Sequence, residues 1–210
     1  MVRQWSVRVA GGTLLLATAA CNRLPMPGVA RGKDVYKTCL PCHGANGGGN
    51  QVLGAPAIAG LPAWFVQTQL ENFQAGRRGY APFDTSGIRM KSMSWAIDLP
   101  GDVQSVAAYI AAMAPTRPTP VLSGDAAAGQ AAFQVCSACH GADAAGNETI
   151  HAPPLAGRSD WYLVAQLHKF RAGWRGTDTT DMWGQTMRPN AMALDDAGMT
   201  NVVAYIQTLR

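Results

Sequence analysis

Apolar residues recur at helical spacing in three stretches of the chain, and each stretch appears twice. In the clearest one, side chains at positions i, i+4 and i+7 are apolar, and this holds for Val66, Leu70 and Phe73 and again for Leu163, Leu167 and Phe170. This spacing puts the side chains on one helix face, so both stretches predict helices that pack against a core.

Two further patterns flank this helix in each half. An earlier one runs into a cysteine-rich phrase, with a glycine and an aromatic residue four positions apart, at Gly32 and Tyr36 and again at Gly129 and Phe133. A later one closes each half with small and branched residues that permit close helix crossing: Val103, Val106, Ala107 and Ile110, then Val202, Val203 and Ile206. The stretches between them are rich in glycine and proline, as in residues 47–49, and predict loops. The fold is therefore predicted to be all-α, with short helices.

The two sets of patterns belong to an internal repeat. Shifting the chain by 97 residues brings Trp64 onto Trp161, Phe73 onto Phe170 and Arg78 onto Arg175, among many other matches. Two copies of this length indicate two tandem domains, each with its own core. We expect domain 1 at residues 31–115 and domain 2 at residues 125–210. Residues 116–124 contain prolines and no helical period, and predict an extended linker.

The most informative match in the repeat is a Cys-x-x-Cys-His phrase. Cys39, Cys42 and His43 form the first copy, and Cys136, Cys139 and His140 form the second. This phrase is typical of covalent haem c attachment, because two thiols one turn apart can form thioethers to one porphyrin while the next imidazole binds its iron. A zinc ribbon would place its cysteine pairs closer together, and a thioredoxin-like pair would follow a strand. We therefore expect two covalent haem c groups, whose apolar mass would complete two small cores.

Methionines are the candidates for the opposite axial ligand of each iron. Met90 follows His43 by 47 residues and Met187 follows His140 by 47 residues, each inside a Gly-x-x-Met phrase. Met93 and Met192 have no methionine at the matching repeat position, so they are the alternatives. His151 and His168 are expected to be surface histidines. Histidine and methionine together would fill both axial positions, which favours electron transfer over catalysis.

With these phrases in place, each half resembles a class I c-type cytochrome, and the tandem resembles the dihaem cytochrome c4 family across residues 31–210. The resemblance implies two cytochrome c domains with helices wrapped around covalent haem. It also implies that the backbone carbonyl of Pro56, and of Pro153, accepts a hydrogen bond from the neighbouring haem-binding histidine. The expected function is a dihaem carrier that shuttles single electrons between redox proteins of a bacterial respiratory chain. The alternatives are a subunit of a larger oxidase or dehydrogenase complex, or a dihaem peroxidase, which would need one iron with an open position.

The N-terminus predicts export. Arg3 and Arg8 precede a short apolar stretch, and small residues precede Cys21 as in a bacterial lipoprotein signal. We expect residues 1–21 to be an export signal with a lipid attachment site at Cys21, followed by a tether over 22–30. The protein would then lie at the periplasmic face of a membrane, held by lipid. The alternatives are ordinary cleavage nearby, which would release it into the periplasm, and an uncleaved anchor.

Charge adds little to this picture. The net charge of +4 becomes +2 when the two arginines of residues 1–20 are removed, so long-range steering would be weak. The sequence has no interleaved basic and aromatic pattern that would indicate nucleic-acid binding. Arg77 and Arg78 are expected to be solvated or paired with haem carboxylates.

Overall fold

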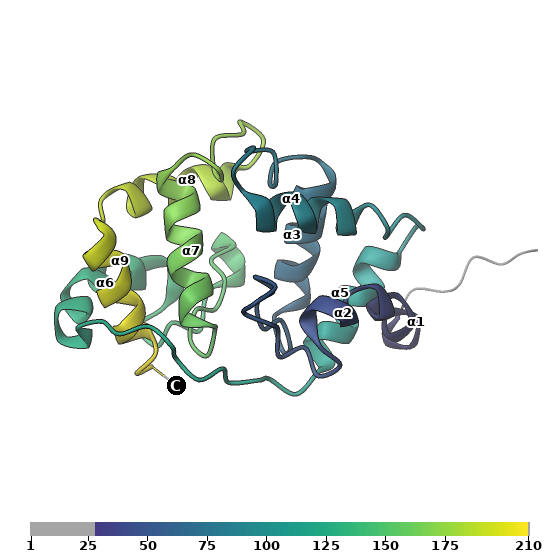
Figure 1. Cartoon of the computed structure of the whole chain (residues 1–210), viewed down its shortest axis with the longest axis horizontal. Coiled ribbons are helices and arrows are strands. Elements are labelled where there is room, and N and C mark those ends of the chain that lie inside the picture. Colours follow the sequence, from purple (N-terminus) through teal and green to yellow (C-terminus); the bar gives the residue numbers. More distant parts are fainter. Residues whose placement is uncertain (1–27, 210) are drawn as a thin grey trace, which may run out of the picture.

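A computed structural model of the chain describes residues 28–209, which fold into helices joined by loops, without strands (Figure 1). The first half contains α1 (Val29–Val35), the 3-10 helix η1 (Tyr36–Thr38), α2 (Leu40–His43), α3 (Ala63–Gln74), α4 (Thr85–Ser94) and α5 (Asp102–Ala112). The second half contains α6 (Ala126–His140), the 3-10 helix η2 (Glu148–Ile150), α7 (Asp160–Arg171), α8 (Met182–Met192) and α9 (Asp196–Ile206). The all-α prediction is confirmed.

The first and last helices of each half cross at a glycine. A Cβ atom on Gly32 would overlap the backbone carbonyl oxygen of Ser105 in α5, and one on Gly129 would overlap that of Asn201 in α9. The two backbones can touch only because these residues lack a side chain. The aromatic residue four positions after each glycine packs on a tyrosine of the last helix: the ring centroids are 5.3 Å apart for Tyr36 and Tyr109, and 5.4 Å apart for Phe133 and Tyr205.

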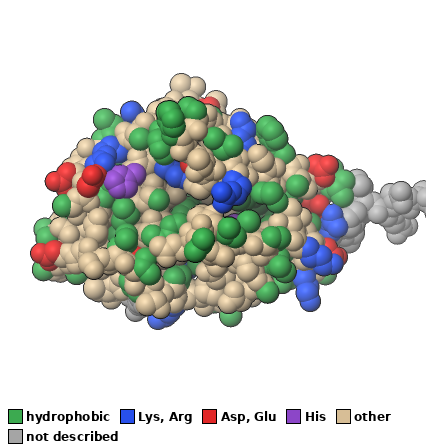
Figure 2. Space-filling view, in the orientation of Figure 1, with side chains coloured by type: hydrophobic (Ala, Val, Ile, Leu, Met, Phe, Trp, Pro, Cys, Tyr) green, Lys and Arg blue, Asp and Glu red, His purple; other side chains and the backbone are tan. Residues whose placement is uncertain are grey.

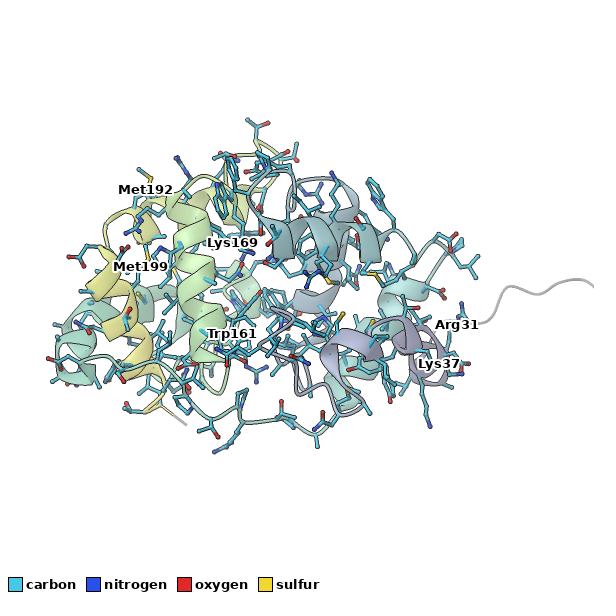
Figure 3. The ribbon with its side chains drawn as sticks, viewed as in Figure 1. Arg31, Lys37, Trp161, Lys169, Met192 and Met199 are labelled. Carbon is cyan, nitrogen blue, oxygen red and sulfur yellow. The ribbon has the colours of Figure 1, made fainter. Side chains whose placement is uncertain are left out.

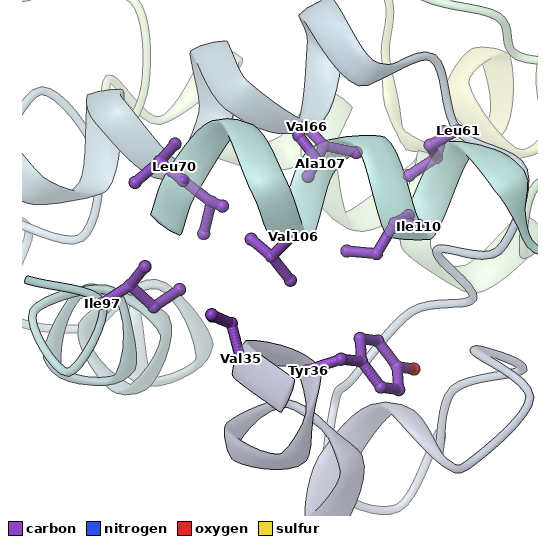
Figure 4. Packing of buried hydrophobic residues seen from close by; sticks show 10 residues of the cluster. Val35, Tyr36, Leu61, Val66, Leu70, Ile97, Val106, Ala107 and Ile110 are labelled. Carbon is purple, nitrogen blue, oxygen red and sulfur yellow. The ribbon is translucent and has the colours of Figure 1, made fainter. Parts of the chain in front are cut away.

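Each half has its own apolar core, built from the predicted stripes. In the first half, Val66 and Leu70 of α3 meet Val106 and Ile110 of α5, with Val35 of α1 closing the cluster (Figure 4). In the second half, Phe133 and Leu163 meet Val202, Val203 and Ile206. These side chains are buried, as the helical spacing predicts.

The first helix differs between the halves because of one proline. In the second half, α6 runs unbroken from Ala126 to His140. In the first half, the same stretch is divided into α1, η1 and α2, and Pro41 lies in the first turn of α2. Proline lacks the amide hydrogen that an internal helix position donates, so it is accommodated at a helix start. The first helix also begins at Val29, within the stretch expected to be tether.

Each half contains one helix more than the apolar pattern predicts. Residues 85–94 and 182–192, expected to be loops, form α4 and α8. Asp84 and Asp181 cap them, because the carboxylates accept hydrogen bonds from the amides of Gly87 and Gly184, at 2.9 and 3.0 Å. The buried residues of both helices are small, Gly87 and Ser94 in α4 and Gly184 and Ala191 in α8, so no stripe of large buried apolar side chains marks these helices in the sequence.

The two halves lie side by side, with α3 and α7 toward the centre and a non-helical connection running along one edge (Figure 1). This connection spans residues 113–125 and is fixed at both ends. Near its start, Pro115 packs on Gly60, and near its end, the amides of Val121 and Leu122 both donate to the Asp160 carboxylate at 2.6 Å. Within residues 28–209, no helix is both long and apolar enough to cross a membrane.

Candidate haem-binding site

The Cys-x-x-Cys-His phrases occupy equivalent places in the two halves, at the C-terminal ends of α2 and α6. His43 and His140 are buried. Cys39, Cys42 and Cys136 are half-buried, and Cys139 is exposed. Gly44 and Gly141 follow with positive φ angles of 77° and 81°, which turn the chain away once the histidine is in place.

A backbone carbonyl orients each buried histidine. The Nδ1 atom of His43 lies 2.9 Å from the carbonyl oxygen of Pro56, and that of His140 lies 2.8 Å from the carbonyl oxygen of Pro153. A carbonyl can only accept, so Nδ1 carries the proton and the lone pair is on Nε2. The hydrogen bond implied by the family resemblance is therefore present in both halves. It fixes the tautomer that a metal requires.

Burial disfavours the charged form of both imidazoles. It lowers the pKa of His43 and of His140 below the ordinary value, and the hydrogen bond to proline offsets this only in part. Burial also raises the pKa of the Cys39 thiol to about 11, with a smaller contribution from Cys42, and raises the pKa of Cys136. Neutral imidazoles with a free Nε2 are what iron ligation needs.

One apolar cavity connects the two halves. It has a volume of about 570 Å³ and is lined by both Cys-x-x-Cys-His phrases together with apolar side chains of α3, α5, α7 and α9. Figure 2 shows hydrophobic side chains around the hollow near the centre of this face. An apolar cavity with thiols and imidazoles at two places in its wall suits two flat, apolar porphyrins.

The placement of the methionines differs between the halves. In the second half, Met187 lines the cavity, whereas Met182 and Met192 do not line it and are 58% and 53% exposed. Met192 lies at the outer end of α8, away from the centre of the molecule (Figure 3). In the first half, Met90 and Met93 both line the cavity, but Met90 is packed against the core while Met93 is exposed. The positions selected by spacing, Met90 and Met187, are thus the more buried candidates.

Buried arginines supply a test of whether haem fits this cavity. Arg78 and Arg175 line it, are 4% and 9% exposed, and each has an Nε atom without a hydrogen-bond partner among residues 28–209. Buried N–H groups without partners are rare in native proteins, and a haem carries two carboxylates that would accept from them. Burial, together with repulsion from Arg78, lowers the pKa of Arg175 to about 9, a cost that nearby anions would relieve. The donor set therefore fits haem.

The two remaining histidines are in different surroundings. His168 lies on α7 beside Arg171 and Asp196, outside the cavity, as expected for a surface histidine. His151 is exposed but lines the cavity and belongs to an aromatic cluster. Its ring stacks on Trp183 at 4.8 Å and meets the edge of Trp64, from the other half, at 5.4 Å. The prediction of a solvated His151 is therefore incomplete, because an exposed histidine gives no sequence signal for such stacking.

Polar contacts between the halves are the main feature that sequence analysis missed. The Oε1 atoms of Gln69 and Gln166 each accept hydrogen bonds from both Arg78 and Arg175. The Tyr80 hydroxyl lies 2.5 Å from that of Thr177, and these two residues are repeat equivalents. Contacts between equivalent positions indicate that an approximate two-fold axis relates the halves. The 97-residue match identified the equivalent residues but not their contacts.

Comparisons with known proteins agree with this geometry. A family model described as cytochrome c matches the chain twice, at residues 29–114 and 126–210. A "thiosulfate dehydrogenase electron acceptor" of Stutzerimonas stutzeri (strain A1501) is 32% identical over 178 residues, which cover 80% of this chain and 76% of that protein. A similar acceptor of Thiomonas intermedia (strain K12) is 33% identical over 181 residues, covering 80% and 77%.

Solved structures show the same two-domain arrangement. The reduced recombinant cytochrome c4 of Pseudomonas stutzeri has a TM-score of 0.70 and 26% identity, covering 88% of this chain and 100% of that chain. A thiosulfate dehydrogenase of Marichromatium purpuratum has a TM-score of 0.69 and 31% identity, covering 86% of this chain. The present chain spans only 40% of that longer protein.

Proposed function

The chain belongs to the cytochrome c family, with one family domain in each half, and on this premise we propose how it holds its cofactors and which proteins it serves. It is a dihaem electron-transfer protein with two covalently bound haem c groups. Cys39 and Cys42 would hold one haem and Cys136 and Cys139 the other. His43 with Met90, and His140 with Met187, would be the axial ligands.

One observation carries this assignment: both halves present the same unit to one apolar cavity. Each unit has a cysteine pair, a neutral imidazole fixed through Nδ1, and a partly buried methionine on a capped helix. Haem iron supplies a change of one electron between its ferrous and ferric states. A histidine and a methionine at each iron would fill both axial positions and leave no open position for a substrate. This arrangement supports electron transfer over a peroxidase.

For the electron donor, we propose a sulfur-compound dehydrogenase. Two relatives that share most of this chain's length are named as thiosulfate dehydrogenase electron acceptors, and a thiosulfate dehydrogenase contains a region of the same fold. A dehydrogenase releases electrons, and two irons can each accept one. The acceptor would be a respiratory complex at the periplasmic face of the membrane.

Stopped-flow mixing with a purified thiosulfate dehydrogenase tests this donor. Thiosulfate plus catalytic enzyme should reduce both haems at a rate proportional to enzyme concentration, and thiosulfate alone should not. Reduction that does not depend on the enzyme, or full inertness in a protein that dithionite reduces, would contradict it.

The second candidate is a cytochrome subunit of a larger complex. The fold is part of a longer thiosulfate dehydrogenase chain, and a cbb3-type oxidase subunit of Sinorhizobium medicae (strain WSM419) is 30% identical over 155 residues. Size-exclusion chromatography of the native protein separates the two candidates. A free carrier elutes at the size of a single mature chain, whereas a subunit elutes with its partners.

Membrane attachment through Cys21 is part of the same proposal. Residue 21 lies outside the described residues, so the support comes from the sequence: small residues precede the cysteine after an apolar stretch. The other four cysteines belong to the haem phrases, which leaves Cys21 as the one without a partner role. Labelled fatty acid should appear on the wild type and be lost in Cys21→Ser. A mature protein that begins at another residue would indicate ordinary export.

A further inference from the structure

A buried lysine joins the halves in a way that breaks their symmetry. Lys169 is on α7 of the second half and projects toward the first half (Figure 3). Its Nζ atom lies 2.6 Å from Asp84 Oδ1 and donates to Ser86 Oγ at 2.7 Å. The lysine side chain is 10% exposed and the aspartate side chain 3%. An ion pair so shielded from water is screened little by salt.

The partners of Lys169 are at the N-terminus of α4. Asp84 is the residue that caps this helix, and Ser86 lies in its first turn. The same helix carries Met90 and Met93, the two candidate axial ligands of the first haem. Gly79 packs directly on the backbone of Gly87, so the start of α4 is also held by close contact with its own domain. The ion pair is an additional tie, and it comes from the other domain.

The second half has no equivalent of this tie. By the 97-residue match, Lys169 corresponds to Asn72 and Asp84 corresponds to Asp181. Asn72 carries no charge and accepts instead from Arg77 of its own domain, at 2.6 Å. Asp181 caps α8, but its Oδ2 atom has no hydrogen-bond partner among the described residues. Arg175 is near enough to interact with the charge of Asp181, yet the two form no salt bridge within residues 28–209.

From this asymmetry we propose that Lys169 is a positioning residue for the methionine helix of the other domain. It makes the helix that carries the sixth ligand of the first haem depend on an ion pair from the other domain, whereas no ion pair from the first half reaches α8 within residues 28–209. Loosening of the interface, as on docking of a redox partner, would therefore affect the first haem selectively. The inference rests on the proposed function, because it takes a methionine of α4 as ligand, but it holds for Met90 and Met93 alike.

Lys169→Met tests this in the intact dihaem protein. It removes the charge and keeps an apolar side chain of similar length. The measurement is the rate at which imidazole displaces methionine from each oxidised iron. Each haem is followed through the paramagnetically shifted methyl signal of its coordinated methionine in NMR spectra of the oxidised protein, and Met187→Ala identifies the signal of the second haem. We expect displacement at the first haem to become about tenfold faster, and that at the second to change less than about twofold.

Two further variants make the result specific. Lys91→Met removes a lysine from α4 itself, where the side chain lies over Trp95 of its own half and forms no ion pair within residues 28–209, and should leave both rates unchanged. The double variant Lys169→Met/Asp84→Asn leaves no unpaired buried charge and keeps a side chain that can cap α4. In this double variant, imidazole should still displace methionine from the first haem at least about threefold faster than in the wild type.

The outcomes are distinct. Equal acceleration at both haems, no acceleration in Lys169→Met, or a wild-type rate in the double variant would overturn the role of Lys169. A wild type with two haems but no methionine signals would overturn the proposed ligands together with this inference. Signals that are present but respond equally would overturn this inference alone.

Discussion

Arg78 and Arg175, repeat equivalents on opposite sides of the domain boundary, donate to the same two side-chain oxygens. Arg78 donates to Gln69 of its own half at 2.6 Å and to Gln166 of the other half at 3.1 Å. Arg175 donates to Gln166 of its own half at 2.8 Å and to Gln69 of the other half at 3.2 Å. Two buried cations held this close to each other repel, and the charges of Asp181 and Asp84 offset this at Arg175 only in part, because its pKa is still lowered to about 9. We therefore expect the haem carboxylates to complete this arrangement.

The arginine pair should raise the redox potentials. A buried cation favours the reduced, less positive iron, so Arg78→Gln and Arg175→Gln should each lower the potential of the nearer haem by roughly 50 mV, the scale expected for loss of one partly screened charge. Spectroelectrochemical titration measures this. The control is Arg77→Gln, which removes the neighbouring, more exposed charge and should shift neither potential by more than about 10 mV. Equal shifts in all three variants would mean that only net charge matters.

Loss of the proposed methionine ligands should be visible in the spectrum of the oxidised protein. Met90→Ala and Met187→Ala should each remove about half of the weak near-infrared sulfur-to-iron band, lower the potential of one haem and allow carbon monoxide to bind the reduced iron. Met192→Ala should leave the band intact and cost at most about 1 kcal/mol of stability, because the side chain is exposed and outside the cavity. If Met93→Ala abolishes the first-haem signal and Met90→Ala does not, the ligand is three residues further along α4.

The glycine crossings should be intolerant of any side chain. A methyl group on Gly32 or Gly129 overlaps a backbone carbonyl of the facing helix, so Gly32→Ala and Gly129→Ala should destabilise the protein by about 3 kcal/mol or more in denaturant unfolding. Gly48→Ala is the control. Its nearest neighbour is the end of the flexible Asn46 side chain, and the loss should be below about 1 kcal/mol. A small effect at Gly32 would mean that α1 and α5 can separate without cost.

Removing one cysteine pair should remove one haem. The double variant Cys39→Ala/Cys42→Ala should retain a single covalent haem on the second half, because each phrase is complete within its own domain. Mass spectrometry of the intact chain counts the adducts. The mirror variant, Cys136→Ala/Cys139→Ala, should keep one haem on the first half. Two covalent haems in either variant would show that the Cys-x-x-Cys-His phrases do not each attach one haem.

The sequence predicts well what each domain does by itself. The spacing of Val66, Leu70 and Phe73 defines α3, and the Cys-x-x-Cys-His phrase together with the repeat locates both cofactor sites. These features can be recognised from local periodicity, or from a combination of residue types that few other kinds of site share. Asp84 and Asp181 are residues of a type that commonly caps helices, but no apolar stripe indicates the helices that follow them.

What could not be predicted lies between the domains. Gln69, Arg78 and Lys169 are polar residues, and a polar residue on a helix is normally taken as solvent-exposed. Their burial depends on how the second half is placed against the first, and no periodicity within one domain encodes that placement. Lys169 and Asn72 differ at equivalent positions of the repeat, and the sequence shows this difference. The sequence does not show that Lys169 forms an ion pair with Asp84 of the other half.

The anchored connection between the domains limits how far they can separate. Pro115 is fixed on Gly60 and Val121 on Asp160, which leaves residues 116–120 as the free length. Six residue steps span at most about 20 Å even when fully extended. A tether this short gives each domain a millimolar-scale local concentration of the other. The halves therefore need only weak mutual affinity to stay closed, and a domain that swings open to meet a partner recloses without a search through solution.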